Sequence, residues 1–176
     1  FNLCSQVMLS IIRLDIPVIA SVHSTATAAG CQLVATCDLA IASENARFAT
    51  PGVNIGLYCT TPMVALSRNI SKKNSMEMLL TGDLIDSYKA KEFGLVNRVV
   101  PEKELEQTVN EIAEKILQKS SKTIAVGKKA FYEQLELGVS EAYELTSMIM
   151  TENMTEYNAQ EGVDAFLKKR SPIWKD

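Results

Sequence analysis

The sequence predicts an α/β protein in which strands alternate with helices first and helices alone follow. The first observation is a strand–turn–helix unit over residues 17–37. The second is a change after Pro101, where short β-branched runs give way to apolar residues at helical spacing. We therefore expect an α/β layer over residues 1–101 and a helical subdomain over residues 102–176.

The first elements come from simple periodicities. Apolar residues at helical spacing predict a helix over residues 1–14. Residues 17–22, PVIASV, begin at a proline and are too short for a helix, so they predict a buried strand. Small residues at 24–30 form a turn, and a nearly all-apolar helix over residues 28–37 follows. Such a helix must be buried on most sides.

The rest of the α/β part is read from turn and capping signals. Ser71 and Ser87 are expected to cap two helices that Gly82 and Gly94 close. The remaining expected elements are strands at 39–42, 47–49 and 95–100, an irregular loop at 53–61, and a helix over residues 62–70.

The last part of the chain is expected to be helical throughout. Its final helix ends in Lys168, Lys169 and Arg170, and cations at this end complement the helix dipole. The expected helices cover residues 105–117, 123–137, 140–157 and 159–170.

Composition excludes several classes of protein. Hydrophobic residues make up 47% and charged residues 22% of 176 residues, as in ordinary soluble domains. A net charge of −3 gives no nucleic-acid footprint, and the apolar runs are too short to span a membrane. Because the sequence starts with Phe1 inside an expected helix, we expect an N-terminally truncated piece, with any targeting peptide outside it.

The cysteines and the single histidine, His23, do not form a metal-binding pattern. Cys4, Cys31, Cys37 and Cys59 include no CxxC pair, so we expect no metal and no cofactor. Buried free thiols in a reducing compartment are the default interpretation.

The start of the helix at residues 28–37 is the candidate site. Its first N–H groups lack acceptors within the helix and carry the positive end of the dipole. Small side chains at Ala28, Ala29 and Gly30 let a ligand oxygen approach, which favours an anion or oxyanion site. Gln32 shares a face with these amides. The alternative is a buried helix whose Gln32 caps a neighbouring loop.

Several stretches, in this order and spacing, resemble the crotonase superfamily, the enoyl-CoA hydratase/isomerase family. The resemblance covers almost the whole chain. The stretches are PVIASVHS at 17–24, AAGCQLVATCD at 28–38, ARFATP at 46–51, LLTG at 79–82, AKEFGLVNRVVP at 90–101 and EGVDAFLKKR at 161–170.

The resemblance implies a fold and a ligand. Residues 1–101 would be the C-terminal part of a ββα spiral core, and the helical subdomain would build a homotrimer or hexamer. An acyl-CoA thioester oxygen would bind the Ala29 N–H next to Gly30. His23, Tyr58 and Phe166 are expected at the acyl-CoA pocket. Lys169 would reach a CoA phosphate from a neighbouring subunit, with dipole compensation as the alternative.

The departures from the family pattern concern catalysis. The two glutamates of family hydratases match Gln32 and Gly52 here. Neither residue can exchange a proton near neutral pH, and general acid–base catalysis needs a titratable group.

We therefore expect a mitochondrial acyl-CoA-binding protein of fatty-acid metabolism without standard hydratase activity. Three interpretations remain open: an enzyme using His23, Tyr58 or Thr60, a non-catalytic acyl-CoA binder or regulator, and a structural partner in mixed oligomers.

Overall fold

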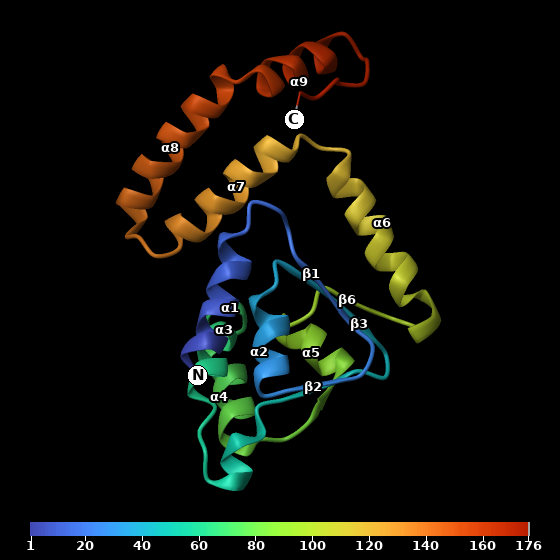
Figure 1. The fold of residues 1–176 in the computed structure, drawn as a ribbon, viewed down its shortest axis with the longest axis vertical. Coiled ribbons are helices and arrows are strands. Elements are labelled where there is room, and N and C mark those ends of the chain that lie inside the picture. The colour runs from blue at the N-terminus through green and yellow to red at the C-terminus, as the bar shows by residue number, and fades with distance from the viewer. Residues whose placement is uncertain (176) are drawn as a thin grey trace. The chain divides into compact units, whose positions relative to one another are not determined.

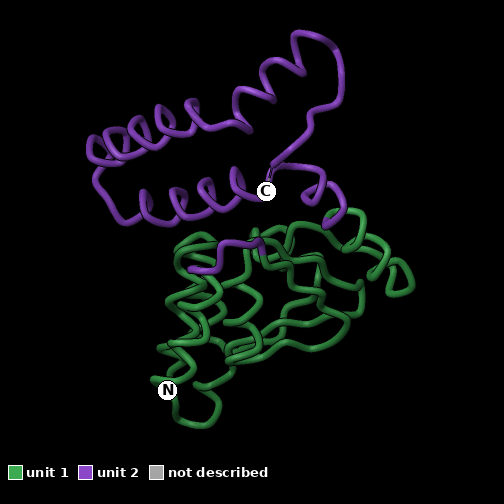
Figure 2. The backbone as a smooth tube through the Cα atoms, turned by 45° about the horizontal axis from the view of Figure 1, so that its top comes forward, with its two compact units in different colours: residues 1–12, 18–112 green, residues 13–17, 113–176 purple. Residues whose placement is uncertain are grey.

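The computed structural model describes residues 1–175, which form two compact units (Figure 2). The first unit comprises residues 1–12 and 18–112. The second comprises residues 13–17 and the described chain from residue 113 onward. The division expected between residues 101 and 102 stays a prediction.

The first unit contains two small sheets whose strands alternate along the chain. One sheet has the order β1-β3-β6 and is parallel throughout. The other has the order β2-β4-β5, with β2 parallel and β5 antiparallel to β4. The strands are β1 (Ile19–Val22), β2 (Thr25–Thr27), β3 (Leu39–Ser43), β4 (Arg47–Ala49), β5 (Ile85–Asp86) and β6 (Arg98–Val100).

This alternation confirms the predicted ββα spiral. The chain runs through β1 in one sheet and β2 in the other, and then forms α2 (Ala29–Thr36) before it returns to β3 and β4. In register, Ile19 lies opposite Leu39 and Thr25 opposite Arg47, so each strand pair repeats the one before it. The start of α2 is therefore placed directly after β2.

Helices α1, α3 and α4 lie on one side of α2, which packs against α3 (Figure 1). The helices and 3-10 turns are α1 (Asn2–Arg13), η1 (Pro51–Ile55), α3 (Thr60–Asn69), α4 (Lys72–Thr81), α5 (Ser87–Phe93), η2 (Glu102–Glu104) and α6 (Leu105–Leu117).

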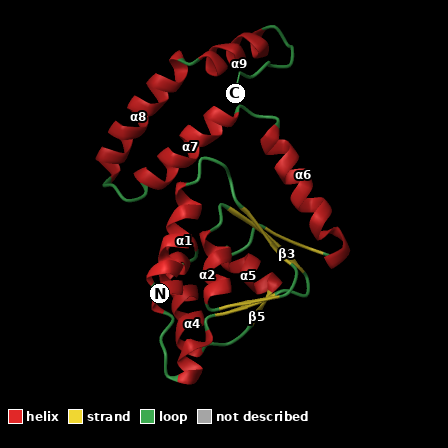
Figure 3. Cartoon of the chain, viewed as in Figure 1, coloured by secondary structure: helices red, strands yellow, loops and turns green. Residues whose placement is uncertain are grey.

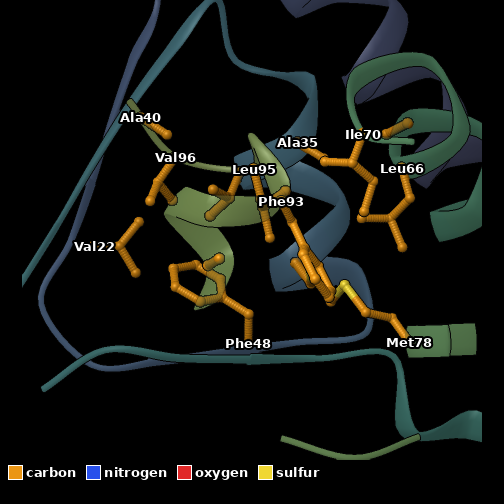
Figure 4. Packing of buried hydrophobic residues seen from close by; sticks show 14 of the residues in the cluster. Val22, Ala35, Ala40, Phe48, Leu66, Ile70, Met78, Phe93, Leu95 and Val96 are labelled. Carbon is orange, nitrogen blue, oxygen red and sulfur yellow. The ribbon is translucent and has the colours of Figure 1, made fainter. Parts of the chain in front are cut away.

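One apolar core holds the first unit together. Figure 4 shows side chains from β1, α2, β4, α3, α4 and α5 gathered in this core. Phe48, Leu66 and Ile41 are completely enclosed. Burying such a side chain contributes about 1.5–3 kcal/mol each, so these residues fix the position of α2 against the sheets. The four cysteines are free thiols as expected, although only Cys31 and Cys59 are fully buried.

Several predicted boundaries were wrong for identifiable reasons. Residues 25–27, expected as a turn, form β2 because Thr25 and Thr27 pair with β4. The cap of α5 is Asp86, whose Oδ1 accepts from the Lys89 N–H at 2.8 Å, whereas the Ser87 hydroxyl donates to the Glu44 carbonyl. The expected cap at Ser71 is confirmed, since its Oγ accepts from Asn74 N–H.

Further differences lie in the loops and in the last strand. Residues 51–55 form η1, although most of this segment was expected as irregular loop, and α3 begins at Thr60 rather than Pro62. β6 is shorter than the strand expected at 95–100. Leu95 and Val96 enter the core instead of the ladder, and the Asn97 N–H donates to the Ala40 carbonyl at 2.8 Å.

The second unit contains helices and loops among its described residues (Figure 3). They include α7 (Ser121–Gln134), α8 (Val139–Thr155) and α9 (Tyr157–Leu167), with α7 packed on α8 and α8 on α9. The helix expected over 140–157 ends at Thr155, and α9 begins two residues later. In the part of the chain that the structure describes, no helix is long and apolar enough to cross a membrane.

Candidate functional site

A sharp turn leads from β2 into α2. Ala28 has φ 49° and ψ −114°, a conformation that favours glycine and that an L side chain rarely adopts. The turn is held on both sides, because the Ala28 N–H donates to the Ala49 carbonyl at 3.0 Å and the Gln32 N–H donates to the Ala28 carbonyl at 2.9 Å. Strained backbone of this kind often marks a functional position.

This turn leaves the first amides of α2 available. The first N–H groups of a helix have no acceptor within it, and they carry the positive end of its dipole. Ala29 is exposed and Gly30 is half-buried. Even a methyl group at Gly30 would lie 3.9 Å from the nearest side chain, that of Ala26. The residues at this helix start therefore carry small or no side chains in open surroundings, which favours the approach of an acceptor oxygen to the Ala29 amide.

Gln32 lies one turn into α2 and is 4% exposed. Its Oε1 accepts a hydrogen bond from the Cys4 thiol of α1 at 3.6 Å. The carbonyl of Gln32 accepts from the Thr36 hydroxyl at 2.8 Å. The expected alternative, a glutamine that caps a neighbouring loop, does not match this arrangement, since the recorded partner of its side chain belongs to a helix.

Gly52 lies in η1, where backbone atoms occupy the space that a side chain would need. A Cβ at this position would lie 2.6 Å from the Leu57 carbonyl oxygen and 2.9 Å from the Cys59 Sγ. The Leu57 N–H also donates to the Gly52 carbonyl at 2.9 Å, so residues 52–57 fold back on themselves. The loop is therefore closed against any larger residue at position 52.

Cys31 lies between Gly30 and Gln32 in the sequence, but its thiol is unreactive. Burial, with a smaller contribution from nearby Cys59, raises the pKa of the Cys31 thiol to about 12, although a hydrogen bond from the Ala49 backbone opposes the shift. The thiolate is the reactive form of cysteine. Cys31 therefore remains a neutral thiol at physiological pH and packs as an apolar residue.

The other predicted pocket residues of the first unit lie in loops. His23 is exposed in the link between β1 and β2. Tyr58 is 39% exposed, and its hydroxyl donates to the Met76 sulfur at 4.0 Å. Their expected roles at an acyl-CoA pocket stay predictions.

Phe166 and Lys169 belong to the second unit. Phe166 is 81% exposed at the end of α9, and Lys169 follows with φ 53°. The Lys169 N–H donates to the Phe166 carbonyl at 3.2 Å, which helps to end the helix. The roles expected for these two residues in binding acyl-CoA stay predictions.

Two features of the site were missed by sequence reasoning. The backbone of Ala28 was not expected to have positive φ, although the run of small residues around it was a signal. The contact of Cys4 with Gln32 had no signal, because the two residues lie 28 positions apart. Among residues 1–175, no group of three or more metal-ligating side chains is close enough to hold a metal ion.

The spiral, its free helix start and the sequence together define the class of protein. A family model described as enoyl-CoA hydratase/isomerase matches residues 3–176, and the chain belongs to this family.

The relatives include enoyl-CoA hydratase domain-containing protein 3, mitochondrial. The Xenopus laevis protein is 50% identical over 174 residues, which cover 99% of this chain and 59% of the relative. The chain thus spans about three fifths of the length of the curated relatives it matches. The names of these relatives describe them as mitochondrial, which agrees with the location predicted for this chain.

Solved structures agree with the fold. The crystal structure of human enoyl-CoA hydratase domain-containing protein 3 gives a TM-score of 0.96 at 49% identity, over 99% of this chain and 69% of that one. An enoyl-CoA hydratase from Mycobacterium smegmatis gives 0.96 at 51% identity, over 97% of this chain and 66% of that one. These matches confirm the crotonase-like fold.

Proposed function

We propose that this chain is part of an acyl-CoA-binding protein of mitochondrial fatty-acid metabolism that lacks standard hydratase activity. The observation that carries the proposal is the start of α2, where the exposed Ala29 offers its amide at the positive end of a helix. A thioester carbonyl oxygen is the acceptor that family members bind. The ligand needs no metal or cofactor for this contact.

The residues at the two positions that match family glutamates support the absence of hydratase chemistry. Hydration needs groups that accept and return a proton, and such groups contribute about 10²- to 10⁴-fold each. The carboxamide of Gln32 does not titrate near neutral pH, and Gly52 has no side chain. The closed loop at Gly52 also leaves no room for another residue to replace the missing carboxylate there.

Two assays on the purified protein test this proposal together. Crotonyl-CoA hydration should be barely above background, whereas calorimetric titration with acetyl-CoA or a longer thioester should show binding. Turnover near that of ordinary hydratases would overturn the proposal and favour an enzyme that uses His23, Tyr58 or Thr60. Absence of any thioester binding would favour a structural partner in mixed oligomers.

A substitution at Ala29 tests where the ligand binds. Ala29→Val keeps the N–H but places two methyl groups in the ligand's path, and overpacking costs about 1–3 kcal/mol, or roughly 5- to 150-fold in affinity. Ala29→Gly keeps the N–H and removes only a methyl group, so it should bind like wild type. Normal binding by a folded Ala29→Val variant would show that the thioester lies elsewhere.

A further inference from the structure

The hydrogen bond between Cys4 and Gln32 gives the carboxamide a defined direction. Cys4 lies in α1 and donates its thiol hydrogen to the Gln32 Oε1. This bond uses one lone pair of the carboxamide oxygen and orients the group, and the two hydrogens on its nitrogen, Nε2, remain as donors. Gln32 thus presents a donor where a glutamate would present an acceptor.

From the usual direction of helix side chains, we expect this donor to lean toward the candidate site. Helix side chains lean toward the N-terminus, over the residues three and four positions earlier. For Gln32 these residues are Ala29 and Ala28. Among residues 1–175, no hydrogen bond is recorded on Nε2, although the side chain is 4% exposed. Among the described residues, Ser75 Oγ is the one fully enclosed side-chain N or O atom without a hydrogen-bond partner. Gln32 Nε2 does not belong to this class, so part of its surface is accessible.

We propose that Cys4 is a positioning residue that holds Gln32 Nε2 toward the Ala29 amide, and that the ligand is an acyl-CoA with a second acceptor oxygen near its thioester. This inference rests on the proposed function. The thioester oxygen binds the Ala29 N–H, and the second oxygen binds Nε2. A 3-oxoacyl-CoA has this chemistry, because a carbonyl oxygen lies two carbons beyond the thioester carbonyl.

The pairing of the Ala29 N–H with Nε2 as two donors also explains why glutamine, and not glutamate, suits position 32. An ionised glutamate would repel a carbonyl or carboxylate oxygen, whereas a carboxamide donates to it without a change of charge. One neutral hydrogen bond raises affinity roughly two- to tenfold. A thioester that lacks the second acceptor oxygen should therefore bind roughly two- to tenfold more weakly.

The test compares two thioesters of equal chain length, 3-oxobutyryl-CoA and butyryl-CoA, by calorimetry on the purified protein. The preference is the ratio of their dissociation constants, which we expect to be roughly two- to tenfold in favour of the 3-oxo ligand. Gln32→Met removes the donor at similar volume and should bring the ratio of the two dissociation constants to about one. Gln32→Glu supplies a second variant and should reverse the preference.

Variants of Cys4 test its positioning role. Cys4→Ala removes the thiol and should reduce the preference toward one, since the carboxamide can then turn. Cys4→Ser keeps a donor and should retain a preference for the 3-oxo ligand, which a merely structural role would not predict.

The outcomes separate this inference from the proposed function. Equal binding of both thioesters by wild type would overturn the ligand class and leave the proposed function standing. If the folded Cys4→Ala variant keeps the wild-type ratio of the two dissociation constants, the positioning role of Cys4 is overturned. If wild type binds neither thioester, the proposed function fails and the inference fails with it.

Discussion

The backbone around the site limits which side chains can fit at individual positions. Gly52 shows this directly, since a methyl group there would lie 2.6 Å from the Leu57 carbonyl oxygen. Such a contact with backbone cannot be relieved by rotating a side chain. At this position, which matches a family glutamate, the fold therefore leaves no space for a side chain.

We expect Gly52→Ala to lower the free energy of unfolding by about 1–3 kcal/mol, because the backbone of residues 52–57 must shift. The matched control is Gly30→Ala, whose Cβ would meet only Ala26 at 3.9 Å. This variant should be stabilised by about 0.5–1 kcal/mol, since alanine favours the helix. Chemical denaturation of both variants measures the difference, and equal stabilities would contradict the clash.

The same clash predicts the result of rebuilding the family pattern. Gln32→Glu combined with Gly52→Glu supplies both carboxylates, but the second cannot be accommodated without moving Leu57. We expect the crotonyl-CoA hydration rate of this double variant to remain near background. A clear gain in turnover over wild type, in a variant that folds, would show that the loop opens more easily than its geometry indicates.

At the scale of elements, the chain after α9 is tied back onto the second unit. The Arg170 guanidinium binds Glu161 at 2.6 and 2.8 Å and Asp164 at 2.7 Å. Glu161 also accepts from the Ile173 N–H at 2.8 Å, and the Trp174 indole donates to the Gln118 carbonyl at 2.8 Å. One carboxylate thus joins α9, Arg170 and the tail.

This connection should depend on pH. Hydrogen bonds from Arg170, and then from the Ile173 N–H, lower the pKa of Glu161 from 4.5 to about 2. A lowered pKa means that the ionised form stabilises the folded state above pH 4.5, and that this contribution is lost as the pH falls toward 2. We expect the tail to detach in this range, measured by fluorescence of Trp174, the chain's one tryptophan.

A glutamine variant isolates the effect of Glu161. Glu161→Gln keeps the shape of the side chain but does not titrate, so its fluorescence should change little between pH 4.5 and 2. Its tail should already be less firmly held at neutral pH, because the charge-assisted bonds to Arg170 are lost. Identical pH curves for wild type and variant would rule out Glu161 as the titrating group.

At the scale of the whole molecule, α7 and α8 expose several large apolar side chains, and contiguous exposed apolar surface often marks an interaction site. Phe131 is 56% exposed, Tyr143 71%, Met148 59% and Met150 63%. Val126, Leu145 and Ile149 also line a cavity of about 790 Å³ between these helices. The residues that line this cavity all belong to the second unit.

We therefore expect the protein to assemble into a homotrimer or hexamer at micromolar concentration, measured by sedimentation velocity. Met148→Asp places a charge on the apolar surface of α8 and should shift the distribution toward smaller species. Lys103→Glu, an exposed change in η2, should leave it unaltered. Sedimentation of wild type as a monomer alone would contradict the prediction.

The sequence by itself determined the elements that depend on local signals. Periodicity identified the helix at 105–117, and a serine hydroxyl identified the start of α4, because spacing and capping act within a few residues. The same locality placed the candidate amides at the start of α2, since a helix start leaves its first N–H groups without acceptors within the helix.

The tertiary structure alone decided features that join distant parts of the chain. Residues 25–27 became a strand because β4 lies beside them, and Leu95 and Val96 left the ladder because the core buries them. The Cys4 thiol reaches Gln32 across 28 residues, and the Leu57 carbonyl closes the space at Gly52. These contacts depend on how the chain folds back on itself, which neither composition nor spacing records.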